Sequence, residues 1–284
     1  MPTPFEQLKE KGLRATRARS QNFLRDPVVS QRIAALIMEE RGEGTEILEI
    51  GPGLGAITMP LISLGAKVTA VELDRGLAQG LRENLKFKDK DLRVINQDIL
   101  KLDVKSLGAG PYLIVGNLPY NISSPVLFWF LENFPSSKGV FMLQKDLVLR
   151  IMAKVGGKDY GRITVGLSPF FHLKSPFDVG SHAFQPRPKV TSSILSLTPK
   201  EDSPKINPRD FGRFTAICFH SRRKTLANNL SMAFGRERAQ RHLLEFNLKT
   251  DIRPEELEAL KFVELFRAFR TEAPQEPPSG AFIP

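Results

Sequence analysis

Short apolar runs alternate with longer amphipathic stretches along the first part of the chain. Apolar runs of about five residues bounded by turn residues predict buried strands, and the stretches between them predict helices. The strands are expected near residues 46–50, 67–72, 92–96, 112–116 and 138–144. Alternation of strand and helix is typical of a doubly wound, mainly parallel sheet. We therefore predict an α/β fold.

A helix is expected before the first of these strands. Asp26 is a capping acid and Pro27 suits the first helical position, so the helix should begin there and run to about Glu40. Residues 1–25, which precede it, look mostly irregular and are rich in lysine and arginine. We treat them as a basic N-terminal segment of the same domain.

Prolines and polar residues mark a boundary after the predicted sheet. Pro199, Pro204 and Pro208 interrupt the chain, and Asn207 then caps a helix to about His220. Further helices are expected near 222–234, 236–247, 254–260 and 261–271. These patterns predict an α/β domain over residues 1–200, a smaller helical domain over residues 201–272, and a disordered tail over residues 273–284.

A glycine-rich turn follows the first predicted strand and precedes a helix expected from Ala56 to Leu64. Glycine at 51 and 53 lets the backbone turn sharply and lets a nucleotide-like ligand approach closely. Gly51-x-Gly53-x-x-Ala56, with Glu72 about 20 residues on, loosely matches the dinucleotide-binding fingerprint. Glu49-x-Gly51-x-Gly53-x-Gly55 instead resembles the first motif of the S-adenosylmethionine methyltransferases. The loop alone does not decide between them.

Acidic residues end the next two predicted strands, at Glu72 and Asp98. The carboxyl ends of parallel strands form the ligand edge of such a sheet. A carboxylate after the second strand can accept hydrogen bonds from both hydroxyls of a ribose, and one after the third can accept from an adenine amino group. Acids in these positions also cap the following helices. We favour ligand binding for Glu72 and leave both interpretations open for Asp98.

Asn117-Leu118-Pro119-Tyr120 follows the next strand and is the most specific motif of the chain. An exocyclic adenine amine is a poor nucleophile because its lone pair is delocalised into the ring. Acceptors placed on its hydrogens, the Asn117 side-chain oxygen and a backbone carbonyl held by Pro119, favour a pyramidal amine that can attack a methyl group. Tyr120 offers a face on which the base can stack. The plainer alternative is a turn with a buried tyrosine.

Together these motifs resemble the KsgA/RsmA-type ribosomal RNA adenine N6,N6-dimethyltransferase family. The matching segments run in family order: Ser20 to Leu24, Glu49 to Gly55, Val71 to Arg75, Gln97-Asp98, Asn117 to Ser123, Gln144-Lys145, Tyr160 to Arg162, Phe184 to Ser192, and Arg222 to Leu230. The resemblance implies a seven-stranded, Rossmann-like class I methyltransferase sheet, completed by a strand pair from residues 171–179 and 190–198.

The resemblance also implies roles for individual residues. Those expected to hold S-adenosylmethionine are Gln21, Asn22, Leu24, Gly51, Gly53, Glu72, Asp98 and Asn117. Asn117 and Leu118 would position the target amine, and Phe184 would close on the adenine opposite Tyr120. Arg187 and Lys189 would meet RNA phosphate. The implied substrate is a pair of adjacent adenosines in the 3′-terminal hairpin loop of 16S ribosomal RNA, with a role in small-subunit biogenesis.

The formal net charge of +10 is unevenly distributed. Residues 1–25 carry a surplus of four positive charges and residues 205–250 a surplus of seven, while the rest of the chain is nearly neutral. Basic segments on both sides of a neutral core indicate that a polyanion is held by them. Arg222, Arg223 and Lys224, with Asn228 and Asn229 one to two turns later, are expected to place phosphate donors on a helix face.

Other classes of function find less support. One cysteine, Cys218, excludes an intramolecular disulfide, and the four histidines show no metal-ligand spacing, so we expect no metal. The chain shows no signal peptide and no apolar run of about 18 residues, and we expect a cytoplasmic monomer.

Three alternatives to the dimethyltransferase stay open. Ser20, where the family commonly has glycine, resembles the Erm-type methyltransferases of large-subunit RNA, although residues 121–123 and 222–230 oppose that assignment. A non-catalytic RNA-binding assembly factor would keep the fold and the basic domain. A nicotinamide dehydrogenase would need a catalytic His/Arg/Asp set, which the chain does not offer.

Overall fold

The computed structural model describes residues 22–83, 91–108 and 110–271, and it divides into two compact units. Within the described residues, the first unit comprises the chain up to residue 148 together with residues 173–199. The second comprises residues 149–172 and 200–271. The sequence suggested a single boundary near residue 200. In the structure, residues 149–172 instead belong to the same unit as the helices after residue 200.

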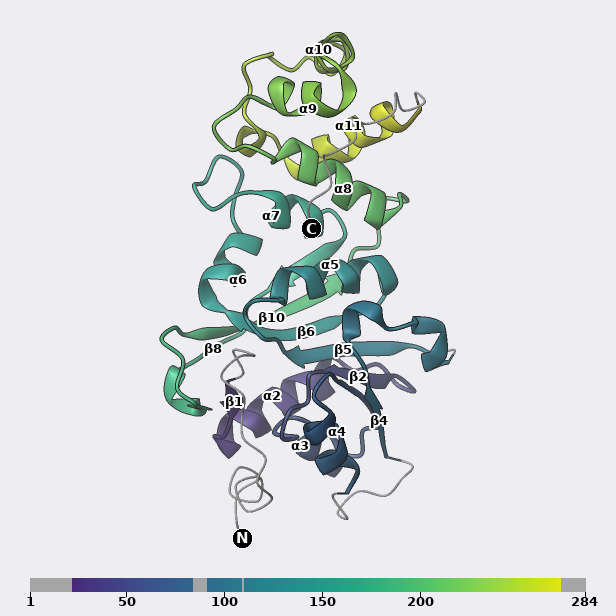
Figure 1. Ribbon diagram of the computed structural model, residues 1–284, viewed down its shortest axis with the longest axis vertical. Coiled ribbons are helices and arrows are strands. Elements are labelled where there is room, and N and C mark those ends of the chain that lie inside the picture. Colours follow the sequence, from purple (N-terminus) through teal and green to yellow (C-terminus); the bar gives the residue numbers. More distant parts are fainter. Residues whose placement is uncertain (1–21, 84–90, 109, 272–284) are drawn as a thin grey trace. The chain divides into compact units, whose positions relative to one another are not determined.

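A mainly parallel sheet forms the centre of the α/β part (Figure 1). Its order is β4-β3-β2-β5-β6-β10-β7, and the two-residue strand β8 also pairs with β10. The bounds are β2 (Glu46–Ile50), β3 (Val68–Glu72), β4 (Leu92–Asn96), β5 (Tyr112–Asn117), β6 (Gly139–Gln144), β7 (Phe171–Lys174), β8 (Asp178–Val179) and β10 (Ser192–Pro199). Each of the first five agrees with its prediction to within one residue. The α/β fold class is confirmed.

Strand directions explain where a site can form. β2 is parallel to both β3 and β5, β3 is parallel to β4, and β5 is parallel to β6. β10 runs antiparallel to β6, with Ser192 opposite Gln144. The segment expected as one strand over residues 171–179 is divided into β7 and β8. The carboxyl ends of β2 to β5 therefore meet at one edge of the sheet.

Side chains from both faces of the sheet are buried. Ile47, Leu113 and Val140 pack in one core cluster with α2 (Pro27–Glu40) and α3 (Thr58–Ser63). On the opposite face, Phe141 meets Phe130 of α5 (Ser123–Asn133), with ring centroids 5.4 Å apart. Helix α4 (Arg75–Arg82) contacts β3 and β4. Burial on both faces accounts for the nearly continuous apolar runs of the strands.

Capping residues define the helix starts that the sequence indicated. The Asp26 carboxylate accepts hydrogen bonds from the backbone N–H groups of Val28 and Val29 at 2.9 and 3.3 Å, and Pro27 is the first residue of α2. α3 begins at Thr58 rather than at Ala56, because residues 53–57 still form the turn. Short 3-10 helices follow β4 at η2 (Ile99–Lys101) and η3 (Val104–Leu107).

The second unit is helical and contains a core rich in phenylalanine. Its elements are α7 (Arg162–Leu167), α8 (Pro208–Cys218), α9 (Leu226–Phe234), α10 (Arg236–Glu245), η5 (Pro254–Glu256) and α11 (Ala259–Thr271). Phe214 packs against Phe266 and Phe269, with ring centroids 5.7 Å away in both cases. The end of α6 (Lys145–Ile151) also belongs to this unit, because the division falls after residue 148. Among the described residues, no helix has the length and apolar character needed to cross a membrane.

Two helix predictions in this unit were wrong, one in its start and one in its length. The helix expected from residue 222 begins at Leu226, because the Thr225 hydroxyl accepts a hydrogen bond from the backbone N–H of Asn228 and caps it. The helix expected over 254–260 is only the single turn of η5, and α11 begins at Ala259.

Candidate functional site

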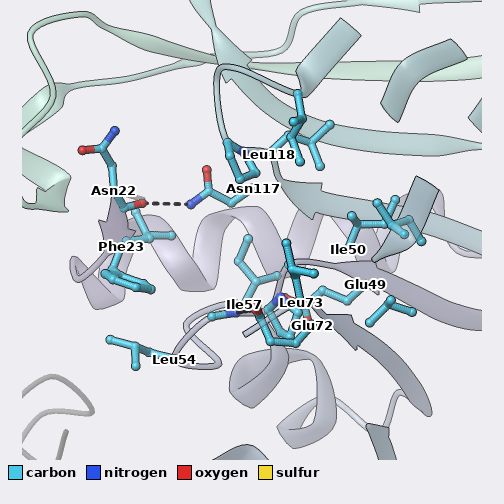
Figure 2. Close-up of a pocket in the computed structure, with 18 of the residues that line it drawn as sticks. Asn22, Phe23, Glu49, Ile50, Leu54, Ile57, Glu72, Leu73, Asn117 and Leu118 are labelled. Atoms are coloured by element: carbon cyan, nitrogen blue, oxygen red, sulfur yellow. Dashed lines mark hydrogen bonds between the residues drawn. The ribbon is translucent and has the colours of Figure 1, made fainter. Parts of the chain in front are cut away.

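A pocket opens at the carboxyl ends of β2, β3, β4 and β5 (Figure 2). Nine of the residues predicted for the site line it: Asn22, Leu24, Gly51, Gly53, Glu72, Asp98, Asn117, Leu118 and Tyr120. The predicted cofactor residues and the predicted amine-binding turn therefore share one cavity. Gln21, the remaining cofactor prediction, lies outside the described residues.

The glycine turn forms one wall of this pocket. Gly51 and Gly53 have φ angles of +66° and +56°, a region that favours glycine. A Cβ atom on Gly53 would lie 3.2 Å from the ring of Phe23, whereas a Cβ on Gly51 would meet no protein atom within 4 Å. The space at Gly53 is thus taken up by Phe23, and the space at Gly51 remains open. Phe23 was not predicted as part of the site.

Glu72 is held in place by the glycine turn and by the turn after β3. The backbone N–H of Gly53 donates to Oε2 at 3.1 Å, and that of Asp74 donates to Oε1 at 2.8 Å. Only 3% of the residue is exposed. Burial raises the pKa of the Glu72 carboxyl above its usual value, against the effect of the two hydrogen bonds. Its carboxylate is fixed next to the turn, where a ligand can reach its remaining lone pairs.

Asp98 caps the helical turn that follows it, and its role in ligand binding stays a prediction. Its Oδ1 accepts a hydrogen bond from the backbone N–H of Leu100 at 3.0 Å and caps η2. The residue also lines the pocket. Because the cap uses one carboxylate oxygen, the geometry is compatible with a ligand contact through the other.

Glu49 is a buried acid that sequence reasoning did not assign to the site. It lies on β2, lines the pocket, and is 1% exposed. The Thr58 hydroxyl donates to its Oε2 at 2.6 Å. Burial raises the pKa of Glu49 to about 7, and the nearby Glu72 carboxyl adds to the increase while the Thr58 hydrogen bond opposes it. Its position two residues before Gly51 was the signal that could have identified it.

A short strap, residues 22–24, lines the pocket beside the glycine turn. β1 (Phe23–Leu24) pairs antiparallel with β9 (Phe184–Gln185), and the backbone N–H of Arg25 donates to the Ala183 carbonyl oxygen at 2.8 Å. Asn22 connects this strap to the turn of residues 117–120: the Nδ2 group of Asn117 donates to the Asn22 carbonyl oxygen at 3.3 Å (Figure 2). This bond leaves the Asn117 Oδ1 atom as an acceptor.

The turn of residues 117–120 is fixed at several points. The backbone N–H of Leu118 donates to the Met142 carbonyl oxygen at 3.2 Å, and Leu118 is 1% exposed. The Ser123 hydroxyl donates to the Pro119 carbonyl oxygen at 3.0 Å. The Tyr120 hydroxyl lies 3.0 Å from that of Ser192. Tyr120 is half-buried and lines the pocket, so it is not a core tyrosine.

Phe184 is not brought to this pocket. The residue is 2% exposed and belongs to the core cluster that includes Leu24 and Ala183, and it is absent from the pocket lining. Its position opposite Leu24 in the β1–β9 pair accounts for this burial. The role expected for Phe184, closing on the adenine opposite Tyr120, stays a prediction, and its ring is buried in this structure.

The predicted RNA contacts lie at exposed positions. Arg187 and Lys189 are exposed in the loop before β10, where the Arg187 Nε group donates to the Ser181 hydroxyl at 3.0 Å. In the second unit, residues 222–224 are exposed in the turn before α9, and Arg222 donates to the Lys158 carbonyl oxygen.

Asn229 was wrongly expected to face phosphate with these basic residues. It is 0% exposed, and its Nδ2 group donates to the carbonyl oxygens of Cys218 and Ser221 at 2.9 and 3.1 Å. Its Oδ1 accepts the backbone N–H of Ser221 at 3.2 Å. These bonds use the amide to hold the turn after α8, so the cationic group at 222–224 forms part of that turn rather than of a helix face.

Comparison with known proteins identifies the family. A family model described as ribosomal RNA adenine dimethylase matches residues 12–270. A protein from Leptothrix cholodnii named ribosomal RNA small subunit methyltransferase A is 40% identical over 268 residues, covering 93% of this chain and 95% of that protein. One of the same name from Aeromonas hydrophila is 40% identical over 250 residues, covering 86% and 89%.

Solved structures agree in fold. A dimethyladenosine transferase from Plasmodium falciparum superposes with a TM-score of 0.69 at 25% identity, covering 88% of this chain and 98% of that one. The 23S rRNA methyltransferase ErmE superposes with a TM-score of 0.61 at 27% identity, covering 87% and 98%. Given the match of the family model to most of its length, this chain belongs to the ribosomal RNA adenine dimethylase family.

Proposed function

We propose that this protein transfers methyl groups from S-adenosylmethionine to N6 of two adjacent adenosines in the 3′-terminal hairpin loop of 16S ribosomal RNA. The product is N6,N6-dimethyladenosine. One observation carries the proposal: the amine-binding turn at Asn117–Tyr120 lines the same pocket as Glu72 and Asp98. A methyl donor held by the two acids then lies within the cavity that receives the base.

The pocket residues fit the cofactor. Glu72 would accept from the ribose hydroxyls, and Asp98 would accept from the adenine amino group. The open space at Gly51 leaves room for the ligand next to the backbone. When bound, S-adenosylmethionine supplies an electrophilic methyl group on its sulfonium. Asn22 and Leu24 of the strap would close over the cofactor.

The turn orients the target amine. Because Nδ2 of Asn117 is engaged by the Asn22 carbonyl, Oδ1 is left to accept one N6 hydrogen. The Pro119 carbonyl already accepts from Ser123 and from the backbone N–H of Ile122, so the second acceptor would be the carbonyl of Leu118. Two such bonds would direct the nitrogen lone pair toward the methyl group. The Tyr120 ring would stack on the base.

Exposed cations supply the affinity for RNA in this proposal. Arg187 and Lys189 extend from the loop that precedes β10 in the first unit, and residues 222–224 provide a second cationic group. Contacts to phosphate position an RNA without reading its sequence, so the choice of substrate rests on the shape of a folded RNA or of a partly assembled particle.

Methyl transfer can be tested on unmethylated small ribosomal subunits. Labelled methyl from S-adenosylmethionine should appear as N6,N6-dimethyladenosine after nuclease digestion and mass spectrometry. Asn117→Ala should abolish most of the transfer, whereas Asn133→Ala, whose amide donates to the Trp129 carbonyl within α5, should retain it. Label in large-subunit RNA would instead establish an Erm-type activity. Binding to the particle without transfer would identify an assembly factor.

A further inference from the structure

The Tyr120 ring is held by a residue far away in the sequence. Its hydroxyl oxygen lies 3.0 Å from the Ser192 Oγ atom, and the two residues are 72 positions apart. Ser192 is 0% exposed, whereas Tyr120 is half-buried. The hydrogen bond thus connects a ring at the pocket wall to a hydroxyl inside the protein.

Ser192 provides a rigid attachment point. It is the first residue of β10, and it is paired on one side with Gln144 of β6 and on the other with Val179 of β8. Immediately before it, the Thr191 carbonyl oxygen accepts the backbone N–H of Lys145 at 3.0 Å. A hydroxyl on a strand paired on both sides has little freedom to move, so the tyrosine bonded to it is restrained at the far end of its ring.

Such a restraint matters because, in the proposed reaction, an aromatic ring would stack on one face of the target base. Phe23 and Tyr120 are the aromatic residues among those that line the described pocket, and the ring of Phe23 lies against Gly53. Phe184 is in the core. With Tyr120 as the aromatic surface next to Asn117, a tilt of this one ring would move the adenine amine out of line with the methyl group. Small errors in such alignment lower the rate of transfer strongly.

We infer that Ser192 is a positioning residue of the methyl-transfer reaction: its buried hydroxyl fixes the plane of the Tyr120 ring on which the target adenine stacks. This inference rests on the proposed function. It assigns Ser192 no contact with the base or the cofactor. The loss of the bond should therefore lower kcat for RNA and leave the affinity for S-adenosylmethionine unchanged.

Three variants and one control test the inference. Ser192→Ala removes the bond from one side, Tyr120→Phe removes it from the other while keeping the ring, and the double variant removes both partners. Ser193→Ala is the matched control, because the Ser193 hydroxyl bonds with Asp178 and Ser175 at 2.8 and 2.9 Å. kcat and KM would be measured with unmethylated small ribosomal subunits, and S-adenosylmethionine binding by calorimetry.

Each single variant should lower kcat by about threefold to tenfold, the effect of one lost hydrogen bond between neutral groups. The double variant should lower kcat no further than either single one, because both remove the same contact. Ser193→Ala should stay within about twofold of wild type. KM for the particle and cofactor affinity should change little in all four.

Additive effects of Ser192→Ala and Tyr120→Phe, or an unchanged kcat in Tyr120→Phe, would overturn the inference. Tyr120→Phe gives a decisive result even if Ser192→Ala fails to fold, because its side chain is half-buried. Absence of any transfer by the wild-type protein would refute the proposed function itself. That outcome is distinct from transfer that occurs normally but does not depend on the bond.

Discussion

Glu49 makes the stability of this protein depend on pH in a predictable direction. Its folded pKa is about 7, against 4.5 for the ordinary side chain, chiefly because burial disfavours the charged form. At a pH between these two pKa values, Glu49 has lost its proton in the unfolded chain but still carries it in the folded protein. The stability that the neutral side chain provides is therefore complete below pH 4.5 and is lost as the pH rises to about 7.

The size of this effect follows from the shift. At about 1.4 kcal/mol for each pKa unit, the free energy of unfolding should lose about 3 kcal/mol over the whole window. Glu49→Gln replaces the carboxyl by a neutral amide of similar shape and removes the proton equilibrium. When the pH is raised from about 5 to about 8, the free energy of unfolding of the variant should therefore rise by about 2 to 3 kcal/mol relative to that of the wild type.

Urea unfolding of both proteins at the two pH values measures this difference. Linear extrapolation gives the free energy of unfolding, and comparing wild type with variant cancels groups that titrate in both. Glu46→Gln, at the half-buried start of the same strand β2, controls for the loss of a carboxylate there. A difference between Glu49→Gln and wild type that is the same at both pH values would refute the assignment of a raised pKa to this residue.

Three further predictions follow from single sites. Glu72→Ala should weaken S-adenosylmethionine binding by at most about 3 to 6 kcal/mol in calorimetry, since two hydrogen bonds to a carboxylate are lost, and unchanged affinity would contradict its role. Replacing residues 222–224 by alanine should flatten the salt dependence of RNA binding by about one log-log unit per lost phosphate contact, with cofactor affinity unaltered. Gly116→Ala should destabilise the fold by more than about 2 kcal/mol in urea unfolding, because its Cβ would lie 2.7 Å from the Ile50 carbonyl oxygen. The control Gly80→Ala in α4 should be neutral or stabilising, because its Cβ would meet no atom within 4 Å.

The sheet and the pocket at its edge were predictable because their signals are local. Strands buried on both faces are nearly continuous apolar runs, so β2 and β5 could be located to within one residue. The carboxyl ends of parallel strands must meet, which brings Gly51, Glu72 and Asp98 together without any knowledge of tertiary contacts. Local chemistry and topology therefore suffice for the framework of the site.

The turn before α9 was not predictable by the same reasoning. Residues 222–224 are good helix formers, and propensity alone extends the helix back through them. The Thr225 cap instead makes the helix begin at Leu226, and the fully buried Asn229 holds the preceding turn through the backbone of Cys218 and Ser221. The capping threonine was visible in the sequence, but the burial of the asparagine depends on helices that are distant along the chain.

Phe184 and Tyr120 show why aromatic residues of a site resist prediction from sequence. Both occur in motifs beside prolines, and either pattern suits a stacking surface. Their long-range partners separate them. Phe184 lies opposite Leu24 in the pair of the short strands β1 and β9, and its ring is in the core. Tyr120 is held at the pocket wall by Ser192. A motif supplies the residue type, but the long-range partner decides which ring lies at the pocket and which lies in the core. Ser192 could be selected only once that partner was known.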